Sequence, residues 1–327
     1  MHDVSYFQKL IDKEISHYSD SLDKTFPVNL YQPVSYALKV GGKRIRPLLV
    51  MLGYQLFQNN PEEIVKAAIA IELFHNFTLL HDDIMDKAEM RRNQPSVHVR
   101  FNENSAILSG DVMAFLAYGL LMEIKSERTP EIISQFTLTA REVCEGQQLD
   151  IDFESRLDVS SDEYIEMIRL KTAVLLGCSL KVGGWLGGCT EETGQILYDA
   201  GIHMGLAFQL MDDLLDTFGD EKTFGKKIGG DIVSNKKTFL LIEALQRATL
   251  PQKKEMETWL SKEIFNKEEK IQAIRIIYRE LGIREITVNR INDFTTRGIH
   301  LIGKLPVPRE RKEPLLALVS SLISRNN

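Results

Sequence analysis

The chain has 327 residues, of which 43% are hydrophobic, and this is enough to bury a sizeable core. A formal net charge of −6 gives no electrostatic case for binding nucleic acid. The three cysteines (Cys144, Cys178 and Cys189) lack CxxC spacing, which argues against disulfides or a zinc site and favours three core residues in a cytoplasmic protein. The amino terminus lacks signal-peptide features, and the most apolar stretch is too broken to predict stable membrane insertion.

Apolar residues recur at helical spacing along nearly every long segment, and no convincing period-two alternation appears. One example is the set Ile64, Ala67, Ala68, Ile71 and Phe74. The pattern predicts an all-α fold. The breaks between segments are too short to be linkers. We therefore expect one domain over residues 1–327, a single large helical bundle around a central cavity.

Two local signals predict where helices begin. Pro61 precedes Glu62 and Glu63, which are acids favourably placed in a first helical turn. Ser160 and Glu163 have the spacing of a capping box, so we expect a helix that runs from there past Lys171.

Two aspartate-rich pentads of the form DDxxD each follow an apolar, helix-periodic stretch. They are made by Asp82, Asp83 and Asp86, and by Asp212, Asp213 and Asp216. Residues four apart share a helix face, so each pentad presents two carboxylates to one point. One such pentad is as often a solvated face as a metal site. Their duplication inside apolar segments favours a hard cation such as Mg²⁺, with metal-bound phosphate held between the two pentads.

Basic residues stand on loops beside the pentads, where they could complete the neutralisation of a phosphate. Singly, each such cluster is usually a solvated surface feature. Two clusters directly follow the pentads: the pair Arg91-Arg92, and the segment from Gly225 to Lys237 that contains Lys226, Lys227 and Lys236. A third, upstream cluster repeats the same chemistry in Gly41-Gly42-Lys43-Arg44-Ile45-Arg46-Pro47. Together with two acidic pentads they form a rare combination.

With these motifs the chain resembles the trans-isoprenyl diphosphate synthases, the polyprenyl synthetase family. The resemblance also rests on Lys171-Thr172 and Phe208-Gln209, and it spans about residues 39–237. It implies an all-helical, homodimeric enzyme. The expected reaction joins isopentenyl diphosphate to an allylic diphosphate (dimethylallyl, geranyl or farnesyl).

The resemblance also implies a role for each motif. The aspartates would bind several Mg²⁺ ions, with Asp83, Asp213 and Asp216 acting directly or through water. The residues implied to contact the allylic diphosphate are Arg91, Lys171 and one of Lys226 and Lys227, with Lys236 at a lid. Those implied to hold isopentenyl diphosphate are Lys43, Arg46, His75 and Arg92. Thr172 and Gln209 would face the developing carbocation, and Gln147 would line the pocket.

Product length is implied to depend on the helix segment before the first pentad. An aromatic residue at Phe77 resembles the short-chain synthases and predicts a C15 to C20 product, and the small Thr78 beside it favours C20. Two other functions remain open at this point. One is a class I terpene cyclase, which would not need a second diphosphate pocket, and the other is a non-catalytic helical subunit that binds prenyl diphosphate.

Overall fold

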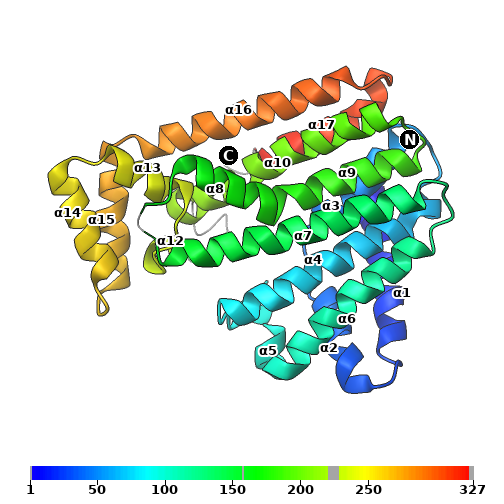
Figure 1. Ribbon diagram of the computed structural model, residues 1–327, viewed down its shortest axis with the longest axis horizontal. Helices are drawn as coiled ribbons and strands as arrows, with labels where there is room; N and C mark the ends of the chain where they lie inside the picture. The colour runs from blue at the N-terminus through cyan, green and yellow to red at the C-terminus, as the bar shows by residue number, and fades with distance from the viewer. Residues whose placement is uncertain (1, 157, 220–227, 324–327) are drawn as a thin grey trace. The chain divides into compact units, whose positions relative to one another are not determined.

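The computed structural model describes residues 2–156, 158–219 and 228–323, and their regular secondary structure is helical apart from one short hairpin (Figure 1). The all-α prediction is therefore confirmed. Contacts between Cα atoms divide the chain into two compact units. The first contains residues 1–137, 178–198 and 305–315, and the second contains 138–177, 199–304 and 316–327. The single-domain interpretation stays a prediction.

The first unit is built around helix α4, which ends at the first aspartate cluster. Pro61 does begin a helix, a 3-10 turn (η1) that continues into α4, and the periodic apolar residues predicted before the cluster are all buried. The elements of this unit are α1 (Val4–Leu22), α2 (Val28–Lys39), α3 (Ile45–Gln55), η1 (Pro61–Ile64), α4 (Val65–Met85), β1 (Met90–Arg91), β2 (Gln94–Pro95), α5 (Val97–Arg100), α6 (Glu103–Met122) and parts of α7 (Thr129–Glu154), α9 (Val174–Leu186), α10 (Glu191–Phe218) and α17 (Arg309–Ile323).

A short hairpin follows α4 and was not expected. Its strands pair antiparallel, with Arg91 opposite Gln94. The two residues between them, Arg92 and Asn93, have φ angles of 51° and 61°. Left-handed conformations at both positions are typical of the tight turns whose twist matches a hairpin. The hairpin turns the chain back directly after the first aspartate cluster.

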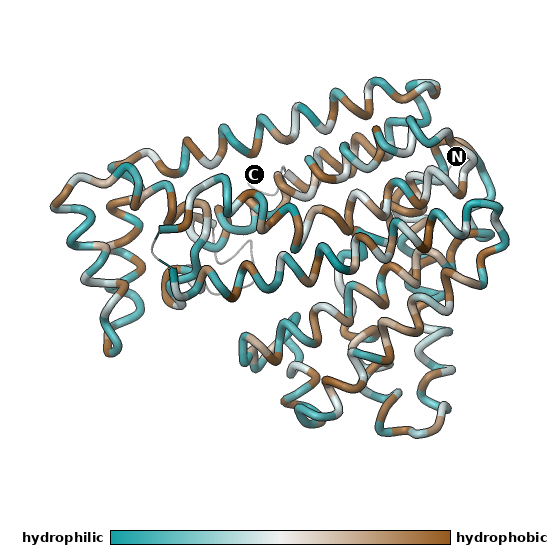
Figure 2. The backbone as a smooth tube through the Cα atoms, in the orientation of Figure 1, coloured by the Kyte–Doolittle hydropathy of each residue, from teal (hydrophilic) through white to brown (hydrophobic). Residues whose placement is uncertain are grey.

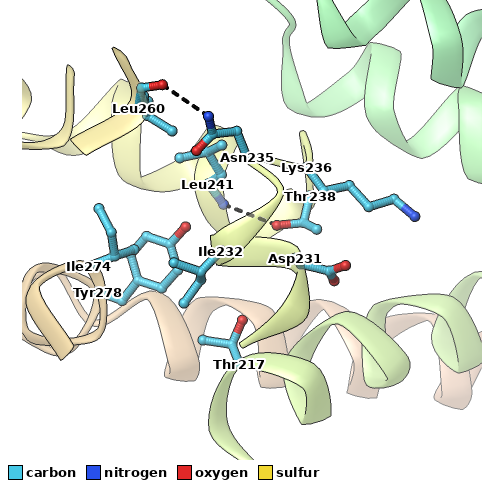
Figure 3. A pocket seen from close by; sticks show the side chains of 10 residues that line it. All are labelled: Thr217, Asp231, Ile232, Asn235, Lys236, Thr238, Leu241, Leu260, Ile274 and Tyr278. Atoms are coloured by element: carbon cyan, nitrogen blue, oxygen red, sulfur yellow. Dashed lines mark hydrogen bonds between the residues drawn. The ribbon is translucent and has the colours of Figure 1, made fainter. Parts of the chain in front are cut away.

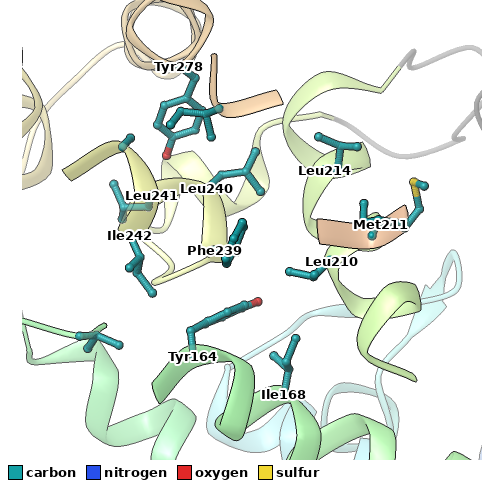
Figure 4. Packing of buried hydrophobic residues seen from close by; sticks show 14 of the residues in the cluster. Tyr164, Ile168, Leu210, Met211, Leu214, Phe239, Leu240, Leu241, Ile242 and Tyr278 are labelled. Carbon is teal, nitrogen blue, oxygen red and sulfur yellow. The ribbon is translucent and has the colours of Figure 1, made fainter. Parts of the chain in front are cut away.

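The second unit surrounds a buried cluster of aromatic and aliphatic side chains (Figure 4). The Tyr164 ring lies beneath Phe239 in this view, and its oxygen points toward the helix that carries Leu210 and Met211. Hydrophobic and hydrophilic residues alternate along α16 at helical spacing (Figure 2). Besides its parts of α7, α9, α10 and α17, the unit contains α8 (Ser161–Ile168), the π-helical turn η2 (Arg169–Ala173), α12 (Gly230–Val233), α13 (Phe239–Arg247), α14 (Leu250–Ser261), α15 (Lys267–Glu280) and α16 (Ile283–Lys304).

Two expectations about local structure need comment. The Ser160–Glu163 capping box is present, but the helix it opens is not regular as far as Lys171, because η2 interrupts it. The expectation that all three cysteines are core residues is wrong for Cys144, which is exposed. Cys144 directly follows the buried Val143 on α7, so its side chain falls on the outward face of that helix.

Candidate active site

The first aspartate cluster lies in the last turn of α4 and divides into one buried and two accessible carboxylates. The Asp83 side chain is 4% exposed and that of Asp82 is 17% exposed, while Asp86 lies at the surface. Asp86 caps the helix by donating its backbone N–H to the carbonyl oxygen of Asp82, at 2.9 Å. Asp82 and Asp86 are four residues apart and thus share one helix face.

Arg91, on strand β1, holds the buried carboxylate. Its Nε donates to Asp83 Oδ1 at 2.9 Å, and its Nη2 contacts Asp83 and, at 3.4 Å, Asp82 Oδ2. Burial raises the pKa of the Asp83 carboxyl, and Arg91 opposes that shift. The hairpin therefore places a cation against the cluster. In this structure Arg91 pairs with carboxylates, and its predicted contact with a diphosphate stays a prediction.

Four residues predicted to hold a second diphosphate belong to the same unit, and the structure pairs two of them directly while a third contacts the glycine turn before the fourth. Arg46 Nη1 lies 3.1 Å from His75 Nε2. Arg92 donates through Nη1 to the carbonyl oxygen of Gly41. A Cβ on Gly42 would stand only 2.5 Å from the Arg92 guanidinium carbon, so the glycine turn is required for this close approach. Lys43 follows directly and is exposed.

His75 is a neutral partner in this group. Burial, followed by the charges of Arg46 and Arg92, holds the pKa of His75 well below its usual range. Because an arginine can only donate, Nε2 must accept from Arg46, and the proton of the neutral ring is then on Nδ1. His75 therefore accepts a hydrogen bond from a cation without adding a positive charge of its own.

The second aspartate cluster lies near the end of α10 and repeats the division found in the first. Asp213 is 3% exposed, whereas Asp212 and Asp216 remain partly exposed. Asp213 accepts hydrogen bonds from the Tyr164 hydroxyl at 2.5 Å and from Gln209 Nε2 at 3.0 Å. Burial, followed by the charge of Asp231, raises the pKa of Asp213 to about 7. A carboxyl enclosed by donors in this way positions its helix, and the predicted contribution of Asp213 to metal binding, directly or through water, stays a prediction.

Gln209 links two residues of the second unit, Thr172 and Asp213. Its Oε1 accepts from the Thr172 hydroxyl at 3.2 Å, while its amide donates to Asp213. Thr172 lies in η2, and Lys171 beside it donates to Asp150 Oδ2 at 2.6 Å. π-Helical turns are frequent at functional sites. Hydrogen bonds thus connect Thr172 and Gln209 to the second cluster, Lys171 precedes Thr172 in the same turn, and Gln147, on α7, is partly buried.

Asp231 belongs to this neighbourhood and was missed by the sequence interpretation. Its backbone N–H donates to Asp216 Oδ2 at 2.9 Å, and Gly229 N–H donates to the Asp216 carbonyl at 2.7 Å. Burial, followed by the charge of Asp216, raises the pKa of Asp231 to about 6. In the small pocket shown in Figure 3, the Asp231 and Lys236 side chains point the same way, away from Ile232 and Tyr278. The only sequence signal was the position of Asp231 after two glycines.

Two further predictions concern the lysine pair at the diphosphate and the residues that limit product length. Lys226 and Lys227, the lysine pair, lie outside the described residues. Phe77 is partly buried on α4, with its ring centroid 5.4 Å from that of Phe74 and 4.9 Å from that of His81. Beside it, Thr78 donates to the His75 carbonyl at 2.8 Å.

The donor chemistry of both clusters fits a hard divalent cation. The accessible groups are carboxylates, without thiolate or imidazole ligands, and this composition suits Mg²⁺ rather than zinc. Among the residues described, no three His, Cys, Asp or Glu side chains gather closely enough to form a complete metal cage.

The polyprenyl synthetase family model matches residues 27–277. The chain is 40% identical over 276 residues to a short chain isoprenyl diphosphate synthase of Methanocaldococcus jannaschii, covering 84% of this chain and 82% of that one. It also resembles a crystal structure of a geranylgeranyl pyrophosphate synthase, with a TM-score of 0.94, 39% identity and 100% of both chains covered. The chain belongs to the polyprenyl synthetase family. As a member, it is an enzyme of the prenyltransferase class, and the family prediction is confirmed.

A further similar structure is the geranylgeranyl pyrophosphate synthase of Corynebacterium glutamicum, which was solved in complex with isoprenyl diphosphate and magnesium. The TM-score is 0.88 at 29% identity, and the match covers 99% of this chain and 100% of that one. In the present chain, the first aspartate cluster belongs to the first unit and the second cluster to the second unit. The prediction that both clusters serve one diphosphate stays a prediction.

Gly146 controls how closely α7 can approach Lys171. A Cβ at this position would lie 2.2 Å from the Lys171 backbone nitrogen, which cannot swing aside. We expect Gly146→Ala to lower the free energy of unfolding by about 1–3 kcal/mol because it overpacks a close contact. Denaturant titration measures the effect. Gly303→Ala, where a Cβ would meet nothing within 4 Å, is the matched helical control, and an equal loss in both variants would contradict the explanation.

Proposed function

We propose that this enzyme condenses isopentenyl diphosphate with an allylic diphosphate (dimethylallyl, geranyl or farnesyl) in a Mg²⁺-dependent reaction. The product would be an all-trans C15 to C20 prenyl diphosphate, with C20 favoured. The observation that carries the proposal is the matched construction of the two aspartate clusters. In each, a buried and hydrogen-bonded middle carboxylate leaves an outer pair on one face.

The proposed chemistry needs charge stabilisation rather than a side chain that acts as nucleophile. Mg²⁺ bound to the outer carboxylates would neutralise the allylic diphosphate as it departs. Asp83 and Asp213 keep those carboxylates oriented. The Thr172–Gln209 pair lies one helical turn from Asp213 and offers oxygen dipoles to a cation-like carbon. Attack by the alkene of isopentenyl diphosphate and loss of a proton to the released diphosphate would complete the condensation.

The group of Lys43, Arg46, His75 and Arg92 favours a two-substrate enzyme over a class I terpene cyclase. A cyclase ionises a single diphosphate and needs no second basic group. Here Arg91 pairs with the first aspartate cluster, while Arg46 and Arg92 make other contacts, with His75 and the glycine turn. A non-catalytic subunit that binds one prenyl diphosphate would not need a second basic group either. These contacts support separate binding of isopentenyl diphosphate.

The direct test of the proposed function is a condensation assay. Purified protein is incubated with Mg²⁺, labelled isopentenyl diphosphate and each allylic primer, and the products are sized after dephosphorylation. We expect Asp212→Ala to lower kcat by about 100- to 1,000-fold, as loss of a group that stabilises developing charge does. Asp199→Ala, on the same helix, is the control and should keep wild-type activity. Absence of incorporation with every primer, or activity unaffected by EDTA, would defeat the proposal.

Phe77 is proposed to limit the length of the product. It lies five residues before Asp82, about 7.5 Å along the helix axis. Its ring joins an aromatic group that continues through Phe74 to Phe136, where the ring centroids are 5.1 Å apart. A hydrocarbon tail that grows along α4 from the first cluster would meet this group. The small Thr78 beside Phe77 supports C20 over C15.

We expect Phe77→Ala to lengthen the main product by at least one isoprene unit, because a bulky side chain no longer blocks the path of the growing tail. Product sizing by chromatography against prenyl alcohol standards measures the shift. Phe26→Ala removes an aromatic side chain that is 88% exposed and should leave the product unchanged. An unaltered product from Phe77→Ala, or wild-type products beyond C25, would remove Phe77 from this role.

A homodimer is proposed from an apolar stripe on α6. This helix is long and apolar enough to cross a membrane by length and composition, yet only 39% of its apolar window is buried. The exposed side chains Leu108 (58%), Phe115 (75%) and Met122 (71%) recur every seven residues. Such a narrow stripe suits packing against another helix. Exposed Asp111 on the same helix disfavours lipid, so a second copy of the chain is the proposed occupant.

We expect Phe115→Glu to raise the dimer dissociation constant by about 30-fold or more, because a central aromatic anchor contributes about 2 kcal/mol. Light scattering coupled to size-exclusion chromatography measures the mass. Ile264→Glu replaces a residue that is 95% exposed outside the stripe and is the control. A wild-type protein that runs as a monomer, or a Phe115→Glu variant that remains fully dimeric, would contradict the proposal.

We also propose a cytoplasmic location, which the three free cysteines support.

A further inference from the structure

Arg44 differs from the basic residues on either side of it. It stands in the Gly41–Pro47 segment between Lys43 and Arg46, both of which are proposed to hold isopentenyl diphosphate. Lys43 is exposed, whereas the Arg44 side chain is only 4% exposed. A buried guanidinium needs partners of its own and is not available to a ligand in solvent.

The partners of Arg44 come from three helices, and the weakest of them is the exposed Asp12 on α1, whose Oδ1 lies 3.7 Å from Arg44 Nε. Nη1 donates to Glu72 Oε1 on α4 at 2.5 Å, and Nη2 donates to the Leu38 carbonyl on α2 at 2.5 Å. The Glu72 side chain is only 2% exposed. Asn76, itself 3% exposed, donates through Nδ2 to Glu72 Oε1 at 3.2 Å and to the Glu72 carbonyl at 2.8 Å. Through these hydrogen bonds the planar guanidinium ties the basic segment to α2 and α4 at fixed directions.

The point of attachment on α4 is one helical turn from His75. Glu72 and His75 are three residues apart, so they lie on neighbouring positions of one helix face. Arg46 reaches His75 at 3.1 Å, so two consecutive contacts, Arg44–Glu72 and Arg46–His75, join the basic segment to the same turns of α4. A change in the first contact would move the second.

The backbone at Arg44 is held in an uncommon conformation. Its φ and ψ are 49° and 37°, in the left-handed region that residues other than glycine seldom adopt. Arg44 also precedes α3, and its carbonyl accepts the N–H of Leu48 at 3.0 Å. Such a conformation persists where the surrounding contacts fix it. The Glu72 and Leu38 contacts supply that constraint and so set the path of the chain from Lys43 to Arg46.

A buried ion pair contributes little net stability compared with an apolar pair of similar volume, because both charges lose their hydration. The value of this pair therefore lies in geometry. We propose that Arg44 and Glu72 are a positioning pair that holds Lys43 and Arg46 in register with His75 on α4, and thereby sets the affinity for the diphosphate of the non-allylic substrate. This inference rests on the proposed function.

The test separates the two substrates. In steady-state assays with each substrate varied in turn, we expect Glu72→Leu to raise KM for isopentenyl diphosphate about tenfold or more. The KM for the allylic diphosphate should stay within about twofold of the wild-type value, because the aspartate clusters are not altered. The conservative variant Glu72→Gln keeps an acceptor for Arg44 and should retain a KM within about threefold of wild type.

A double variant distinguishes positioning from folding. Arg44→Met combined with Glu72→Leu replaces both buried charges by apolar groups, so it should fold even if Glu72→Leu alone does not. We expect its KM for isopentenyl diphosphate to remain raised about tenfold while its thermal midpoint approaches that of the wild type. A wild-type KM in the double variant, or equal rises in KM for both substrates, would overturn the proposal.

The matched control is Lys181→Met. Lys181 is another buried cation of the first unit, with a 6% exposed side chain that lies 3.1 Å from Glu191 and 3.0 Å from Gln195. Its loss should lower the thermal midpoint without changing either KM. Lys43→Ala reports on the binding site itself. An inactive wild type would refute the proposed function, whereas an active wild type in which Lys43→Ala but no Glu72 variant raises KM would refute only the positioning role.

Discussion

In each aspartate cluster the middle carboxylate is buried and enclosed by donors, and the accessible carboxylates depend on this arrangement. A buried carboxyl without partners is costly, so Asp83 and Asp213 fix how their helices can rotate. The donors differ: Arg91 serves the first cluster, and Tyr164 with Gln209 serves the second. In both cases the outer aspartates, four residues apart, are left on one helix face.

The same donors connect the clusters to the rest of their units. Arg91 carries the hairpin that brings Arg92 to the glycine turn, and Tyr164 anchors α8 to the core of the second unit. Gln209 extends the second network to Thr172 in the π-helical turn. The polar network and the core therefore share residues, so packing changes near Tyr164 or Gly146 would be felt at the site.

Much of the site could be predicted from the sequence because its motifs are local. The pentads, the Arg pair and the GGKRIRP segment each lie within a few residues. Their spacing shows which carboxylates share a helix face, and the resemblance to the family implies the roles of the cations. Asp231, Tyr164 and Glu72 were not found. Their partners stand 15, 49 and 28 residues away, and nothing in the local pattern distinguishes them from ordinary helix or loop residues. For the same reason, Arg44 could be mistaken for a cation that binds a ligand, because Lys43 and Arg46 on either side of it are predicted to do so.

The sequence by itself determined the helical class and the positions of the accessible carboxylates, because hydrophobic period and four-residue spacing are properties of the helix alone. Only the tertiary structure decided which charges are available to a ligand. Burial and long-range hydrogen bonds turn Asp83, Asp213, Arg44 and Glu72 inward, and these depend on which helices pack together. The sequence does not distinguish a charged residue that faces solvent from one that completes a buried ion pair.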